Sequence, residues 1–132
     1  MPDLQSALRA RLIADAAITA AIGTRAFWVL VPQDAPLPYL RMQTVSDPRP
    51  QHLGGYNGAR ETRVQVDCFA KDYATARALA ENIIAAVAEP ATVAGVKFGR
   101  IKAEGPRDLG EDTSTGFIHR LSMDLLIWHS LA

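Results

Sequence analysis

The three histidines and the single cysteine are the side chains that most often bind metals or act as nucleophiles, so their spacing tests for catalysis first. None of His52, His119 and His129 lies three or four residues from another histidine or from Cys68. Ten residues of strand would separate His119 from His129 by about 33 Å. The spacing therefore predicts histidines that are solvated or hydrogen-bonded, and no metal site.

The remaining candidate groups also lack the neighbouring functional residues that catalysis requires. Cys68 alternates with valines and is predicted to be a small buried hydrophobic residue. Glu111 and Asp112, with Asp108 nearby, lie in a segment rich in Gly, Ser and Thr, where acids are usually only solvated. The glycines of residues 54–58 match no phosphate-binding pattern. We therefore expect no enzyme and no cofactor.

Composition narrows the class of protein further. The chain has 132 residues, with 14 Lys plus Arg and 14 Asp plus Glu, so its net charge is zero. This length suits one domain, over 1–132. A neutral chain is not expected to hold DNA or acidic lipid by bulk attraction. One cysteine excludes an internal disulfide framework, and no stretch approaches the ~18 apolar residues of a membrane span. The N-terminus also lacks the pattern of a secretory signal.

Periodicity predicts the elements that must position these residues. Apolar residues at helical spacing indicate helices over 4–22 and 73–88. Alternation indicates strands over 39–45, 60–70, 96–103 and 117–129, with a doubtful first strand at 26–31. Residues 32–38 carry three prolines and are predicted to form a loop, as are the long segments 46–58 and 105–116, which we expect to be mobile.

The resulting order, α-β-β-β-α-β-β, predicts an α+β fold. A mostly antiparallel sheet of four or five strands, with both helices on one face, would bury every apolar stripe. The opposite face would carry Phe69, Leu126 and Trp128 among polar residues. Because a monomer would leave these three apolar groups in water, we expect another subunit to cover them. The predicted subunit interface comprises Phe69, Leu126, Trp128, Arg63, Arg120 and Asp124.

An ordered set of weak motifs runs along almost the whole chain. It consists of Ala21-Ile22-Gly23-Thr24-Arg25, Ala35-Pro36-Leu37-Pro38-Tyr39-Leu40, the strand 63–70, the helix start 73–80 and the closing Ile127-Trp128-His129. From about residue 5 to 130 this set resembles the tail completion, or tail terminator, proteins of long-tailed phages, prophages and gene transfer agents.

The resemblance implies a structural virion protein. Such proteins form a ring, typically of six copies, at the head-proximal end of the tail tube. The ring ends tube polymerisation and joins the tail to the head connector or stopper protein, and DNA passes through its lumen without sequence-specific binding. The family supplies no site residues to carry over. From loop chemistry we expect partner docking at Arg49, His52 and Tyr56 in one loop, and at Arg107 and Asp108 in the other.

Two alternatives stay open on the sequence. The chain could be another head–tail joining or tube component of similar size. It could also be a small α/β ligand-binding domain or enzyme, although that class needs convergent polar groups in an apolar pocket, and the motifs above provide none.

Overall fold

The computed structural model describes residues 3–49, 59–114 and 116–131. Their order along the chain is two helices, three strands, a third helix and three further strands. The elements are α1 (Leu4–Ile13), α2 (Ala16–Ile22), β1 (Ala26–Trp28), β2 (Tyr39–Ser46), β3 (Arg60–Ala70), α3 (Tyr73–Ala86), β4 (Ala91–Val93), β5 (Val96–Thr113) and β6 (Gly116–Leu131).

The six strands form one mixed sheet in the order β1-β2-β3-β6-β5-β4. β1 pairs with β2 in parallel, and the other neighbours are antiparallel. The predicted α+β class is confirmed, whereas the predicted count of four or five strands is too low. The short strand Ala91–Val93 was missed because three residues are too few for alternation to be recognised.

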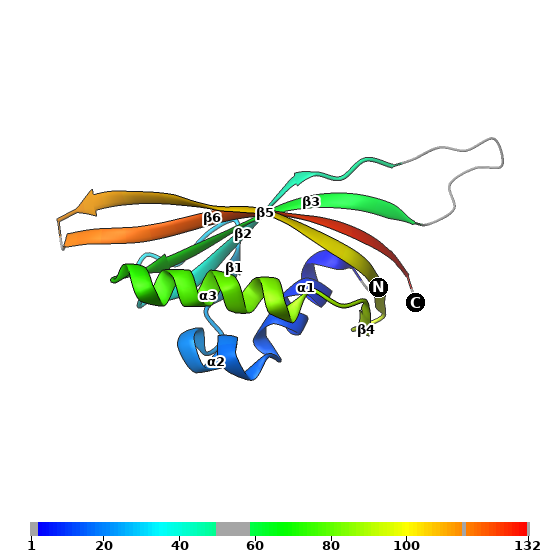
Figure 1. The fold of residues 1–132 in the computed structure, drawn as a ribbon, viewed down its shortest axis with the longest axis horizontal. Coiled ribbons are helices and arrows are strands. Elements are labelled where there is room, and N and C mark those ends of the chain that lie inside the picture. The colour runs from blue at the N-terminus through cyan, green and yellow to red at the C-terminus, as the bar shows by residue number, and fades with distance from the viewer. Residues whose placement is uncertain (1–2, 50–58, 115, 132) are drawn as a thin grey trace.

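The three helices lie on one face of the sheet (Figure 1). Their apolar sides meet the inward residues of β3 and β6 in a continuous core. Fully buried members include Leu8, Leu12, Ile18, Ile22, Leu79, Ile83, Val64, Val66, Leu121, Met123 and Leu125. No helix of the described residues covers the other face of the sheet, so its side chains are available for contacts outside the chain.

The predicted helix over 4–22 is two helices rather than one. α1 ends at Ile13, and Asp15 caps α2 by accepting hydrogen bonds from the backbone N–H groups of Ala17 and Ile18, at 3.0 and 3.2 Å. The periodicity of alanine and leucine continued across this break, but an aspartate followed by apolar residues is also a start signal for a helix. The chain turns there, and Ile18 and Ile22 reach the core from a second direction.

The prediction of a loop over 105–116 is wrong, because β5 and β6 continue through it as a long hairpin. Gly105 and Pro106 are accommodated at an irregular position of β5. Gly105 has a φ of +104° and Pro106 follows it, at a register shift between Glu104 and Arg107. Among the described residues, β5 has no strand partner beyond Phe98 on that side, and an edge strand tolerates a proline.

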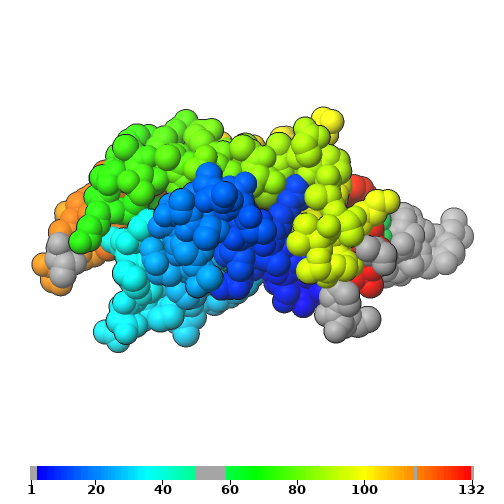
Figure 2. All heavy atoms as spheres, turned by 90° about the horizontal axis from the view of Figure 1, so that it is seen from below, coloured from blue at the N-terminus to red at the C-terminus, as the bar shows by residue number. Residues whose placement is uncertain are grey.

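The hairpin projects past the rest of the sheet. The last pair between β3 and β6 is Ala70 with His119, so residues beyond it belong to a two-stranded ribbon. In Figure 1 this ribbon extends past the start of α3 at the left end, opposite the chain termini, and in Figure 2 it protrudes beyond the helices. We call residues 108–114 and 116–118 the hairpin arm.

Candidate assembly surfaces

The register of the central strands fixes which side chains share the helix-free face. Direct cross-strand partners point to the same side of a sheet, so this face can be read from the pairing. From β2 through β3 and β6 to β5 it carries Arg41, Gln43, Arg63, Gln65, Asp67, Phe69, Arg120, Ser122, Asp124, Leu126, Trp128, Lys102, Glu104 and Arg107. The face is mainly a polar surface, with a few apolar groups among charges.

Asp67 is the centre of a charge network on this face. Its side chain is fully buried and accepts hydrogen bonds from Arg41 and Arg120, both at 3.0 Å, and from Gln65 at 3.2 Å. Burial by itself raises the pKa of this carboxyl, but the hydrogen bonds from Ser122, Arg41 and Gln65 outweigh it and hold the pKa below its usual value. Asp67 is therefore ionised and fixes two arginines across three strands.

Phe69 is covered within a single chain, so the expectation that a monomer leaves it in water is wrong. It is 5% exposed and stacks on Tyr39, with ring centroids 4.9 Å apart. The guanidinium groups of Arg41 and Arg120 lie 5.5 and 5.7 Å from its ring centre. These partners come from β2 and β6 and could not be read from the alternation of β3 alone. Phe69 supports the arginines that a partner would meet.

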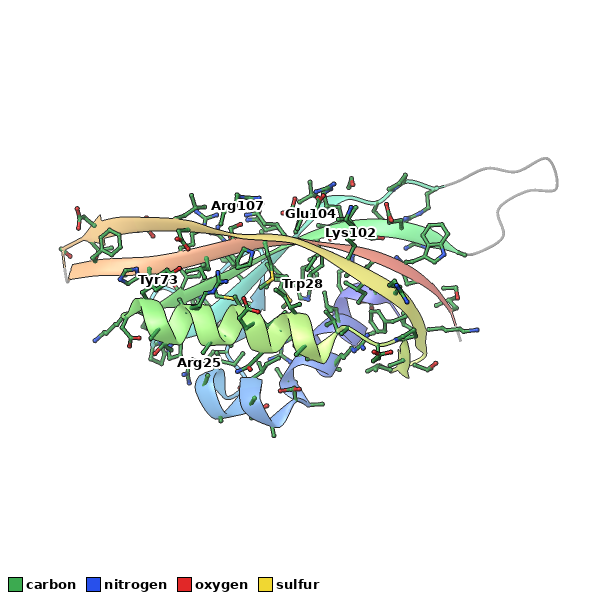
Figure 3. All side chains as sticks on the ribbon, in the orientation of Figure 1. Arg25, Trp28, Tyr73, Lys102, Glu104 and Arg107 are labelled. Carbon is green, nitrogen blue, oxygen red and sulfur yellow. The ribbon has the colours of Figure 1, made fainter. Side chains whose placement is uncertain are left out.

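A second charge cluster lies beside the first. Arg63 donates to Glu104 at 2.9 Å and to Asp124 at 2.7 Å, and thus links β3, β6 and β5. Figure 3 shows Glu104, with Lys102 and Arg107, on the side of the sheet away from the helices. The predicted residues Arg63, Arg120 and Asp124 are therefore brought onto one surface, where they are tied to neighbouring strands.

Besides Leu109 on the hairpin arm, whose register partner is Arg120, this face exposes the large apolar side chain of Trp128. Its side chain is 49% exposed, and Leu126, two residues earlier on the same side, is half-buried. Trp128 borders a hollow of about 210 Å³ together with Ala59, Lys97, Gly99, His129 and Ser130. This is below the ~300 Å³ at which small-molecule sites begin, but it is suitable for one side chain of a partner. Trp28 differs, because its indole N–H donates to the Gln5 carbonyl at 3.0 Å and its ring packs on the core.

The predicted docking loop of 46–58 lies largely outside the described residues, which is where His52 and Tyr56 fall. Arg49 is described, and its exposed side chain pairs with Asp47 at 2.7 Å. Asp47 also accepts from Arg60 at 2.7 Å and from Thr62 at 2.9 Å. Partial burial of Asp47 raises its pKa, but the hydrogen bonds from these three residues lower it to about 2.

His129 lies beneath this cluster and is hydrogen-bonded within the chain. It is 6% exposed, and its Nε2 is 2.7 Å from the Thr62 hydroxyl. Burial, followed by the positive charge of Arg60, lowers the pKa of the ring, so the neutral form is favoured in the folded chain. The prediction of a hydrogen-bonded histidine is confirmed here.

Arg107 and Asp108 do not form one surface, although they are neighbours in the sequence. Arg107 pairs in register with Ser122, donates to its hydroxyl at 3.3 Å, and lies on the helix-free face. Asp108 points to the other side and accepts from the hydroxyl of Tyr73, at the start of α3, at 3.2 Å. Figure 3 shows Tyr73 on the hairpin-facing side of the helix. Asp108 thus helps to brace the arm on α3.

The sequence reasoning missed the hairpin arm as a surface. Leu109 is 44% exposed and Phe117 is 48% exposed. The Phe117 ring crosses Gly110, where a Cβ would lie 2.7 Å from the ring's Cε2, and it meets the His119 ring edge-on with centroids 4.9 Å apart. The available signal was the presence of apolar residues on both sides of a turn, Leu109 before it and Phe117-Ile118 after it, which is typical of a hairpin.

The described residues offer no reactive centre. Cys68 is fully buried as predicted, and burial, with the nearby charge of Asp67, raises the pKa of its thiol far above the usual range. Across residues 3–49, 59–114 and 116–131, no three His, Cys, Asp or Glu side chains gather as a metal site would require. Within the same ranges, no helix is both long and apolar enough to cross a bilayer.

Two comparisons with known proteins found a matching family and a solved structure of similar fold. Residues 6–130 match the family described as "Tail completion protein gp17". A chain of the solved structure titled "Virion of native gene transfer agent (GTA) particle" is similar in fold, with a TM-score of 0.63 and 20% sequence identity. That alignment covers 97% of this chain and 93% of the other, and at this identity it shows the fold alone. No curated protein matches the chain.

Proposed function

We propose, because the chain belongs to the tail completion protein gp17 family, that it forms a ring at the head-proximal end of a tail tube. Membership confirms the resemblance found in the sequence and makes the chain a structural protein of a virion tail, not an enzyme. The ring would end tube polymerisation and join the tail to the head connector or stopper protein. The match over residues 6–130 is the observation that carries this proposal.

The helix-free face supports self-association. Its charged side chains are held by neighbouring strands, as Asp67 holds Arg41 and Arg120, so they present a pre-formed pattern to a partner. Trp128 adds a half-exposed aromatic side chain of the kind that dominates interface energetics. The proposed subunit interface remains Leu126, Trp128, Arg63, Arg120 and Asp124, with Phe69 acting from beneath.

The charge balance supports a lumen through which DNA passes without being held. Equal numbers of acidic and basic residues give a net charge of zero. In the two charge clusters of the described face, Arg63 is shared by two carboxylates and Asp67 by two arginines, so the positive and negative groups of these clusters offset each other. A surface of this kind would release few counterions on meeting DNA and would bind it weakly.

Partner docking is proposed for the segment that contains Arg49, His52 and Tyr56, and for Arg107 on the sheet face. The exposed side chain of Arg49 supports the first contact. Arg107 lies beside Ser122 at the base of the hairpin arm and supports the second.

The experiment compares tails made with and without this chain. Loss of a tail-ending ring should give overlong tails or tails that are not joined to heads, whereas loss of a tube subunit should give no tails. In parallel, native mass spectrometry and negative-stain imaging of the purified chain with tail tube protein should show one closed ring at tube ends. A chain that stays monomeric and never associates with tube ends would refute the proposal.

A further inference from the structure

The two ends of the molecule differ in charge and both expose apolar side chains. The hairpin arm contains Asp108, Glu111 and Asp112 and no basic residue, and it exposes Leu109 and Phe117. An extended two-stranded ribbon is marginally stable alone in water, so an arm of this kind is expected to dock on something.

The opposite end of the sheet carries the complementary chemistry. We call Lys97, Gly99, Lys102, Leu126 and Trp128 the tryptophan patch. Lys97 lines the hollow beside Trp128, and Lys102 is in register with Leu126. Both lysines are exposed, and neither forms an ion pair within the described ranges.

Glu61 is in register with Trp128 and opposes this charge in part, which leaves the patch with one excess positive charge. The Cβ that Gly99 lacks would lie 3.4 Å from the Trp128 ring and 3.2 Å from the Trp128 carbonyl. The absence of a side chain at Gly99 therefore keeps the hollow open against the indole. The patch combines a shallow apolar site with cations at its rim, as a binding site for an acidic, partly apolar segment requires.

The arm cannot reach the patch of its own chain. Phe117 and Trp128 are eleven positions apart on the continuous strand β6, which at ~3.3 Å per residue is about 36 Å. Figure 1 shows the arm at one end of the long sheet and the C-terminus, which follows Trp128, at the other. Complementary surfaces at opposite ends of one molecule are satisfied by head-to-tail contact between copies, and such contacts close into a ring if the rotation permits.

We propose that the hairpin arm of one copy docks on the tryptophan patch of the next copy. In this contact Phe117 covers Trp128. Asp112, its register partner on the same face of the arm, approaches Lys97 and Lys102, while Glu111 lies on the opposite face and adds to the negative charge of the arm. The inference rests on the proposed ring function and names the contact that would build the ring.

The test reverses the charges of each surface in the full chain. One variant carries Glu111→Lys and Asp112→Lys, and the other carries Lys97→Glu and Lys102→Glu. Each alone would place like charges at every contact, so self-association should fall at least about tenfold by sedimentation velocity. In an equimolar mixture each arm finds a patch of opposite sign, and association should return to within about threefold of the original chain.

The matched control is Lys71→Glu with Arg77→Glu, which changes the net charge as much as the patch variant does. Lys71 precedes α3 and Arg77 lies on it, and both are exposed. This control should associate like the original chain. A second readout is disulfide trapping between an Asp112→Cys chain and a Lys97→Cys chain, since buried Cys68 will not compete. Asp112→Cys mixed with Lys71→Cys gives the background.

The inference is overturned if neither reversal weakens association, if the mixture fails to recover, or if trapping does not exceed background. A ring that forms regardless of these changes would leave the proposed function standing and remove only this contact. The inference would also be overturned if the arm-reversal variant still self-associated but no longer bound to tube ends. That result would mean that the arm contacts the tube protein instead of the next copy. Normal tails in a strain lacking the chain would instead refute the proposed function.

Discussion

Replacing Asp67 by asparagine tests whether the helix-free face is organised from one buried carboxylate. Asp67→Asn keeps the shape but removes the charge that Arg41 and Arg120 share, each at 3.0 Å. Breaking a buried ion pair by removing one partner costs roughly 3–5 kcal/mol. The two arginine side chains are 27% and 28% exposed and can turn partly to water, so we expect a loss near the lower limit, about 3 kcal/mol.

The assay is urea unfolding followed by circular dichroism, with Glu104→Gln as the matched control. Glu104 is 44% exposed, and its partner Arg63 keeps Asp124 at 2.7 Å, so the control should cost about 1 kcal/mol or less. If Asp67→Asn lost no more stability than Glu104→Gln, the view of Asp67 as the organising group of this face would be refuted.

The same variant has a signature in pH. The pKa of Asp67 is lower in the folded chain than its ordinary value of 3.8, so the folded state binds this proton less readily than the unfolded state. The stabilisation is therefore complete above pH 3.8 and is lost as the pH falls through the folded pKa. The difference in unfolding free energy between the original chain and Asp67→Asn should shrink below pH 3.8. A difference that stays constant down to pH 2.5 would contradict this.

Three further substitutions test the exposed surfaces. Trp128→Ala should cost the monomer about 1–2 kcal/mol in urea, less than the ~3–5 kcal/mol of a core aromatic, while lowering self-association at least tenfold. Gly110→Ala should displace the Phe117 ring, which is detected as a shift of the His119 ring resonances at unchanged global stability. Val29 is 64% exposed with a φ of +67°, so Val29→Asn should raise the unfolding free energy by about 1 kcal/mol; no gain would mean that the left-handed backbone carries no strain.

The strands β3 and β6, which have one face buried against the helices, were predictable from the sequence. In β3 and β6 the buried residues Val64, Val66, Leu121 and Met123 alternate with polar ones, and the structure keeps that alternation. Alternation assigns a residue to a face of the sheet but does not show which side chains from other strands pack on that residue. Phe69 was therefore assigned to the correct side and wrongly left exposed, because its covering ring, Tyr39, comes from another strand.

The hairpin arm shows the second limit of sequence reasoning. Glycine, proline and clustered acids between 105 and 116 are the ordinary composition of a loop. In the structure the same residues are paired, because backbone hydrogen bonding to β6 outweighs the weak local preference of these residues for a loop. Pro106 lies at a register shift and Gly110 gives space to Phe117, so two residues that indicated a loop are each fitted to a position in a strand.

A net charge of zero can describe a chain with little charge or one whose charges are separated, and the two behave differently. Here the acids of residues 108–112 lie at one end of a long sheet, and Lys97 and Lys102 lie towards the other. Such a molecule has no net attraction to a uniform polyanion such as DNA. Its separated charges nevertheless favour one relative orientation when two copies approach each other. Exposed charges are screened over about 10 Å at 0.1 M salt. Docking that relies on both charge and Trp128 should therefore weaken with salt without being abolished, since the apolar part of the contact persists.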